Sequence, residues 1–360
     1  MSDDGNTLVW SDALGRQRRG GSWADLAVGT APRIEAALHA SDFATVSRLT
    51  DFFLVEARVI YDLYAQWQRD IRRFLNAKLP DPQLLAVRIG EIEALVTHHH
   101  SILAVGREAA WQSINDAAQR LKGEHAVRDF AQMRDHWRAL HDGEVDLIGG
   151  LMDIVIRELG EAALGEMYED WLLGEWFRQR YVRFDVSKVP WTDAFELIVY
   201  LTFESMHGHM SGPERDGTVT YEEFDDRITL TFAPCGSGGR MLVGEPRDQL
   251  APLMEPPFGY RVLQEPHAFA WNTRGVCAYC AHCCVLTEKM PIEHFGYPVR
   301  VVDPPTYPND GDAVCRWTVY RKPEYVPEHV YTRLGARKPP AGAQLGSAGF
   351  ASRPRRRPPL

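Results

Sequence analysis

The chain has 360 residues, of which 45% are hydrophobic and 25% charged, and its formal net charge is -9 at pH 7. Such a length and composition are typical of a globular protein with two domains or one large core. The negative charge argues against a general nucleic-acid-binding protein, because neutralising phosphates requires a basic surface.

The first residues are acidic and lack the apolar segment of a signal peptide. No uninterrupted apolar run is long enough to span a membrane. We therefore expect a cytoplasmic protein that binds neither nucleic acid nor membrane and acts on a small molecule. The sequence does not indicate its oligomeric state.

Residues 1–30 are rich in glycine, serine, aspartate and arginine, which predicts a mobile arm. Helical periodicity then continues over residues 31–206. We expect six helices with a break at Gly143, over residues 32–48, 51–78, 83–121, 125–142, 144–180 and 191–206.

The pattern changes at His207, where alternation of polar and apolar residues begins. It predicts antiparallel strands over 217–221, 227–232, 297–302 and 315–320, and a short helix over 281–289. The fold class that we predict is α+β. It comprises a helical domain (31–206), an α+β cysteine-rich metal-binding module (207–336) and a disordered tail rich in proline and arginine (337–360).

The strongest functional signal is residues 277–284, Cys-Ala-Tyr-Cys-Ala-His-Cys-Cys, which hold four of the six cysteines. The other two cysteines lie in the same third of the chain. Thiolates and an imidazole at this spacing can converge on one metal ion. The candidate ligands are Cys235, Cys277, Cys280, His282, Cys283, Cys284 and Cys315. Disulfides are disfavoured, since they require an oxidising compartment.

Two kinds of metal centre fit this cluster. Zinc is the metal that we expect, because a histidine and remote cysteines suit a mixed Cys/His site. The spacing of Cys277, Cys280 and Cys283 is also used by iron–sulfur clusters, with Cys315 as a fourth ligand. The sequence leaves both possibilities open.

Cys235 begins the segment Cys-Gly-Ser-Gly-Gly-Arg, whose glycines allow several backbone N–H groups to face one point. Ser237 and Arg240 are therefore candidates for binding a substrate carboxylate. The segment has one residue fewer than a phosphatase loop between cysteine and arginine, and it lacks the ending of a nucleotide P-loop. The alternative is a tight turn in which Cys235 is a metal ligand or a core residue.

His207 and His209 lie where the helical part meets the strands. Histidines can exchange protons at neutral pH, so these two are the candidate catalytic residues, and an inactive polar loop is the alternative.

An acidic cluster lies further upstream, at His141, Asp142, Glu144 and Asp146. It could bind a metal or supply a general base, and the alternative is a capped, solvated helix start. Asp142 and Asp146 would share a face if the helix continued through Gly143.

The stretch Gly296-Tyr-Pro-Val-Arg-Val-Val, with the later Gly311-Asp-Ala-Val-Cys-Arg-Trp, resembles the end of 4-vinyl reductase-type domains. The chain is also similar to the L-2-amino-thiazoline-4-carboxylic acid hydrolase-like family, through Cys235, the 277–284 cluster and Cys315. The resemblance covers residues 217–321. It implies a zinc ion held by cysteines and by a carboxylate, here Asp303, although prolines stand where a further cysteine is expected.

These features lead to three functional hypotheses. The first is a metal-dependent enzyme, a zinc hydrolase that acts on a small carboxylate-bearing molecule. The second is a small-molecule-binding or sensory protein in which zinc holds the module together. The third is an iron–sulfur redox protein, which visible absorbance would reveal.

Overall fold

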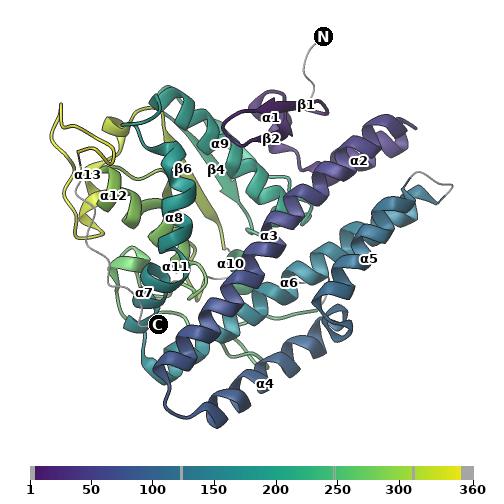
Figure 1. Cartoon of the computed structure of the whole chain (residues 1–360), viewed down its shortest axis with the longest axis horizontal. Coiled ribbons are helices and arrows are strands. Elements are labelled where there is room, and N and C mark those ends of the chain that lie inside the picture. Colours follow the sequence, from purple (N-terminus) through teal and green to yellow (C-terminus); the bar gives the residue numbers. More distant parts are fainter. Residues whose placement is uncertain (1–4, 122–124, 246, 248, 310–312, 350–360) are drawn as a thin grey trace.

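The computed structural model describes residues 5–121, 125–245, 247, 249–309 and 313–349. It combines helices with small antiparallel sheets, which confirms the predicted α+β class (Figure 1). Helices dominate the first 208 residues, and both strands and short helices follow.

The helical part is built around two long helices that pack against each other (Figure 1). Its α-helices are α1 Trp23–Ala27, α2 Thr30–His39, α3 Phe43–Lys78, α4 Pro82–His99, α5 Arg107–Arg120, α6 Ala126–Leu159, α7 Ala162–Glu166, α8 Gly174–Arg180 and α9 Trp191–Gly208. Shorter 3-10 and π-helical turns join them, at η1 Ser101–Val105, η2 Met167–Leu172 and η3 Tyr181–Phe184. Helices α3 and α6 carry many of the buried side chains of the core.

Two glycines explain why the observed helix boundaries differ from the predicted ones. The expected break at Gly143 is wrong, because α6 continues through it. A Cβ atom at Gly143 would lie 2.7 Å from Leu103 Cδ1, so glycine allows a close approach of chains there. The predicted 83–121 helix is instead interrupted between His99 and Arg107 by the 3-10 turn η1 and by Gly106, whose φ of 86° favours glycine.

The N-terminal segment, expected to be a mobile arm, forms a hairpin of β1 Leu8–Ser11 and β2 Arg16–Arg19. Arg19 is fully buried and donates hydrogen bonds to the Gly5, Val28 and Asp25 carbonyls. These bonds anchor the hairpin to the turn before α2, so most of this segment is ordered.

The second part contains a four-stranded antiparallel sheet in the order β3-β4-β6-β5. Its strands are β3 Thr220–Glu223, β4 Arg227–Phe232, β5 Val301–Asp303 and β6 Cys315–Tyr320. The predictions of β4 and β6 are confirmed to the residue, whereas β3 and β5 begin later than expected. The α-helices of this part are α10 Gly238–Val243, α11 Ala281–Cys284, α12 Met290–Phe295 and α13 Glu328–Thr332, and 3-10 or π-helical turns form η5 Ala268–Ala270, η6 Val285–Lys289 and η7 Pro323–Tyr325.

One hydrophobic core joins the helices to the sheet among the described residues. The predicted boundary at residue 207 therefore separates two patterns of secondary structure that share a core. Residues 337–349 of the predicted tail contain no helix or strand, and the Ser347 N–H donates to Asp185 Oδ1 at 2.9 Å. Residues 350–360 lie outside the described residues.

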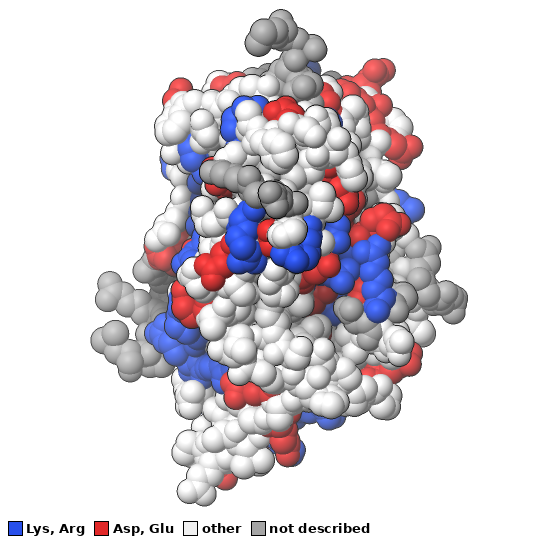
Figure 2. Space-filling view, turned by 90° about the vertical axis from the view of Figure 1, so that its right-hand side faces the viewer, with Lys and Arg blue, Asp and Glu red and all other residues white. Residues whose placement is uncertain are grey.

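None of the helices in the described part of the chain is both long and apolar enough to cross a lipid bilayer. Figure 2 shows the face at the right of Figure 1, where basic and acidic side chains lie interspersed among broad uncharged areas.

Candidate functional site

A cavity of about 290 Å³ lies between α3, α8, α9 and the cysteine-bearing segments. Aromatic side chains form much of its wall, among them Trp67, Trp176, Tyr181, Phe184, Trp271 and Trp317. Cysteines, histidines and arginines supply its polar groups. The volume lies near the lower end of the range for pockets that bind small molecules.

Four of the six cysteines line this cavity, namely Cys235, Cys280, Cys283 and Cys315. Strand pairing brings two of them together, because β4 and β6 pair in a register that sets Phe232 opposite Cys315. Cys235 follows Phe232 by three residues, so it lies at the same edge of the sheet. Cys280 and Cys283 come from the start of α11, one helical turn apart.

The four thiols interact electrostatically inside the cavity. Burial raises the pKa of Cys283 well above its usual value, and Cys315 and Cys235 raise it further. Burial and then Cys235 act in the same way on the pKa of Cys315. The Cys283 and Cys315 thiols therefore form thiolates only when a positive partner compensates the charge.

Two N–H groups donate hydrogen bonds to these sulfur atoms. The backbone N–H of Gly239 donates to Cys235 Sγ at 3.0 Å. The indole N–H of Trp317 donates to Cys315 Sγ at 3.2 Å. Such bonds stabilise a thiolate, and hydrogen bonds to sulfur are a means by which proteins tune metal centres.

The other two cysteines do not line the cavity. Cys277 is buried and its thiol is hydrogen-bonded to Cys280, a contact that raises the pKa of Cys280 together with burial. Cys284 accepts the Trp271 N–H at 3.3 Å and donates to the Ala268 carbonyl at 3.5 Å. The predicted ligand set is thus divided, with four sulfurs facing the cavity and two facing its surroundings.

His282 also lines the cavity, and burial lowers its pKa to about 4, so the ring is neutral at physiological pH. Its Nδ1–H donates to the Tyr279 carbonyl, and its Nε2 lies 3.4 Å from Cys283 Sγ. Asp303, the carboxylate suggested by the family resemblance, has a side chain that is 65% exposed and does not line the cavity.

The glycine loop after Cys235 differs from the anion cradle that we predicted. A Cβ atom at Gly238 would lie 2.3 Å from Cys280 Sγ, so glycine lets the loop backbone pack directly against this sulfur. Ser237 lines the cavity, but Arg240 does not. Arg240 is fully buried and forms an ion pair with Asp146, so its guanidinium is not available to a substrate carboxylate.

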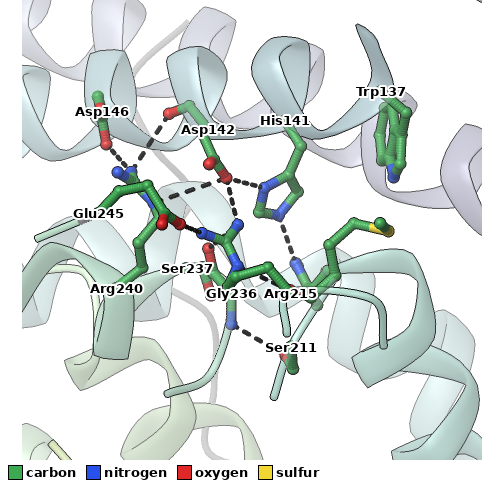
Figure 3. Close-up of polar contacts among 12 residues, drawn as sticks. Trp137, His141, Asp142, Asp146, Ser211, Arg215, Gly236, Ser237, Arg240 and Glu245 are labelled. Carbon is green, nitrogen blue, oxygen red and sulfur yellow. Dashed lines mark hydrogen bonds and ion pairs between the residues drawn. The ribbon is translucent and has the colours of Figure 1, made fainter. Parts of the chain in front are cut away.

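Arg240 belongs to a network of buried charged side chains (Figure 3). Arg215 contacts Asp142 at 2.7 Å and Glu245 at 2.6 Å. Burial would raise the pKa of Asp142, but Arg215 and Arg240 outweigh it and hold this pKa well below its usual value. Asp142 therefore stays ionised, and Asp142 and Asp146 share a helix face, as expected for a continuous α6.

This network explains the acidic cluster found in the sequence. Asp146 also accepts a hydrogen bond from His100 at 2.7 Å, and Glu144 pairs with Arg107 at 2.9 Å. The cluster lies in the middle of α6 and is buried, so it is not a solvated helix start. Its carboxylates bind arginine and histidine side chains of this chain.

A histidine pair connects the charge network to the cavity. His141 Nδ1 lies 2.8 Å from Asp142, and because a carboxylate only accepts, this nitrogen carries the proton. Neutral His141 therefore presents an unprotonated Nε2 to His209 Nδ1, at 3.0 Å. His209 lines the cavity, and burial followed by the neighbouring His141 lowers its pKa well below the usual value.

Tyr64 lies beside both rings, with its hydroxyl 3.1 Å from His209 Nδ1 and 3.0 Å from the Tyr279 hydroxyl. His207, the other predicted catalytic histidine, is buried and does not line the cavity. It contacts Glu56 at 2.9 Å and the Leu26 carbonyl at 2.8 Å. The structure therefore brings only His209 of this pair to the cavity.

The sequence did not indicate four arginines that line the cavity, namely Arg16, Arg180, Arg183 and Arg300. Arg300 is 8% exposed, donates to Thr202 Oγ1 at 2.7 Å and lies over the Trp317 ring. Burial lowers its pKa, while Tyr181 and Cys283 act to raise it. No sequence motif identifies these arginines, because they come from three separate segments of the chain.

Among the described residues, no three histidine, cysteine, aspartate or glutamate side chains are arranged to hold a single metal ion. No family model matches the chain, and neither a curated protein nor a solved structure does. The resemblance to the reductase-type and hydrolase-like families stays a prediction. Gly311 and Asp312 of its closing motif lie outside the described residues.

Proposed function

We propose that Cys235, Cys280, Cys283 and Cys315 bind an iron–sulfur cluster and that the protein is an oxidoreductase acting on a small molecule in the same cavity. The observation that carries this proposal is that four cysteines from three chain segments line one cavity. Each also interacts electrostatically with at least one other of the four.

The arrangement favours a cluster over a single zinc ion. Zinc requires three or four ligands around one point, and the described residues contain no such group. A cluster is instead held by thiolates distributed around its outside, which suits sulfurs that line a cavity. We therefore place the iron–sulfur alternative ahead of the zinc hydrolase and of the zinc-stabilised sensory protein.

The surroundings of the four sulfurs support the same proposal. The N–H groups of Gly239 and Trp317 donate to two of them. Arg300 supplies a buried positive charge close to Cys283, and it forms no ion pair with a carboxylate of the described residues. An anionic cluster would provide that missing negative charge.

When bound, the cluster would supply one-electron transfer to the molecule in the cavity. The residues of the chain would bind that molecule and manage its protons. The aromatic wall would exclude water around it. His209, linked through His141 to the ionised Asp142, would exchange a proton with it.

Anaerobic purification followed by reduction with dithionite tests this function. We expect broad visible absorbance that bleaches on reduction and returns on oxidation, together with an electron paramagnetic resonance signal of the reduced cluster. Cys284→Ala is the matched control, because Cys284 lies outside the cavity and the variant should keep this behaviour. A colourless protein that holds one zinc ion would overturn the proposal.

A further inference from the structure

The mouth of the cavity carries more positive than negative charge. Arg180 ends α8 and Arg183 lies in the following turn η3, so one helical turn brings both to the cavity wall. Burial lowers the pKa of Arg183, and repulsion from Arg180 and Arg16 lowers it further. Arg180 and Arg16 therefore lie close enough to Arg183 to destabilise its positive charge.

The two glutamates that line the cavity are already bound elsewhere. Glu204 accepts a two-pronged contact from Arg16 and a hydrogen bond from the Tyr200 hydroxyl at 2.6 Å. Glu56 binds His207 at 2.9 Å. Within the described part of the chain, neither Arg180 nor Arg183 has a carboxylate partner. Their positive charges are thus uncompensated by the protein.

The space next to these arginines suits a flat apolar group. Trp176 lies beside Tyr181, with ring centroids 5.7 Å apart, and Arg180 lies over the Trp176 ring at 5.2 Å. Phe184 and Trp67 extend the aromatic wall inward. At about 290 Å³ the cavity is small, so it suits a molecule of one or two rings better than a nucleotide.

We propose that this cavity binds a small aromatic carboxylate, with its ring against the aromatic wall and its carboxylate on Arg183 and Arg180. Naming this anion the substrate rests on the oxidoreductase function proposed above. Its binding does not, because the two arginines belong to α8 and η3, which carry none of the four cysteines. They also lie outside the segment that carries the family resemblance.

Isothermal titration calorimetry with matched pairs of probes tests this site. The probes are benzoate, trans-cinnamate and 2-naphthoate, each compared with its neutral amide, against the protein as isolated. A charged hydrogen bond between arginine and carboxylate predicts that at least one acid binds about ten- to a hundredfold more tightly than its amide. Equal binding of acid and amide, or no binding of any probe at millimolar concentration, would overturn the proposal.

Substitutions then locate the carboxylate. Arg183→Ala should abolish the preference for acid over amide, and Arg183→Lys should retain part of it. Because Arg183 is partly exposed and has no carboxylate partner among the described residues, we expect the alanine variant to fold, which circular dichroism checks. Arg128→Ala removes an exposed arginine that does not line the cavity and should leave binding unchanged. An unchanged preference in folded Arg183→Ala contradicts the site.

The outcomes separate this inference from the proposed function. If the protein lacks iron but binds the acid more tightly than the amide, the carboxylate site is supported and the redox function is wrong. If the protein contains the cluster but binds acid and amide equally, the redox function is supported and the aromatic carboxylate is not its substrate.

Discussion

Two groups of buried polar side chains lie beside one another, and they differ in how completely the protein satisfies them. In the charge network, Asp142 and Glu245 bind Arg215, and Asp146 binds Arg240 and His100. On the cavity wall, the four sulfurs interact mainly with each other and with N–H donors. Each charged side chain of the network has an oppositely charged partner, although the buried Nε and Nη1 of Arg240 have no hydrogen-bond partner. On the cavity wall, Arg180, Arg183 and Arg300 form no ion pair with a carboxylate of the described residues.

This difference distinguishes side chains that stabilise the fold from side chains that are arranged to bind a ligand. A buried ion pair with both partners present needs nothing further, so the network is best understood as a support for α6 and the loop that carries Arg215. Buried thiols with raised pKa values and arginines without carboxylates are costly unless a ligand completes them. The comparison therefore predicts that substitutions in the wall change ligand content, while substitutions in the network change stability.

The largest effect is expected from the cavity cysteines. Single substitutions of Cys235, Cys280, Cys283 or Cys315 by serine should remove most of the bound iron, because each supplies one of the four ligands. Iron per chain and visible absorbance measure the loss, and far-ultraviolet circular dichroism checks the fold. Cys284→Ala should keep its iron. If it lost as much iron as Cys283→Ser, the distinction between the two sets of cysteines would be wrong.

The next largest effect is expected in the charge network. Arg215→Met leaves Asp142 and Glu245 without this partner and should lower the free energy of unfolding by about 3–5 kcal/mol. Denaturant unfolding measures it. Arg274→Ala is the control, since this arginine pairs with Glu265 at the surface and its loss should cost less than about 1 kcal/mol. Equal costs for the two variants would contradict the contrast between a buried network and a surface pair.

A smaller effect concerns pH and the histidine that joins the two regions. Burial and then His141 lower the pKa of His209 in the folded protein. The unfolded chain takes up this proton below about pH 6.5, so the stability due to neutral His209 is present above that pH and lost as the pH falls. By pH 5.5 this loss amounts to about 1.4 kcal/mol.

The variant His209→Gln isolates this contribution. Between pH 7.5 and 5.5, its free energy of unfolding should fall by roughly 1 kcal/mol less than that of the unsubstituted protein. The comparison uses denaturant unfolding at both pH values. Parallel pH dependences for the two proteins would show that His209 is not held neutral.

The smallest effect is expected at the rim of the cavity. Arg16 binds Glu204 and ties the N-terminal hairpin to α9, but its side chain is 28% exposed. Arg16→Ala should therefore lower the free energy of unfolding by only about 1 kcal/mol. A thermal-unfolding series with Arg16→Ala beside Arg215→Met checks the order, and a larger loss in Arg16→Ala would reverse the roles assigned to rim and network.

Local patterns predicted the long helical regions and the four strands of the main sheet, two of these strands to the residue. Periodicity identified the regions of α3, α9, β4 and β6, because each has a clear apolar face. It misplaced the break in α6, since Gly143 is required by the approach of Leu103 and not by a turn. It also treated the first thirty residues as mobile, because their composition does not reveal that Arg19 is buried and bound to the carbonyls of Gly5, Asp25 and Val28.

The candidate site could be predicted only in part. The cysteine spacing identified Cys280 and Cys283, and the isolated Cys235 and Cys315 reach them through the pairing of β4 with β6. Arg240 was predicted to bind a substrate because it follows a glycine-rich loop, but it forms an ion pair with Asp146 of α6. Arg183 and Arg300 had no local signal, because their role depends on which side chains fold around them.

Iron, acid-labile sulfide and zinc, measured per chain in anaerobically purified protein, test the central claim most directly. A cluster held by four cysteines predicts iron and sulfide in equal amounts, about two or about four of each per chain, with little zinc. One zinc ion without sulfide, or protein free of metal after anaerobic purification, would contradict it.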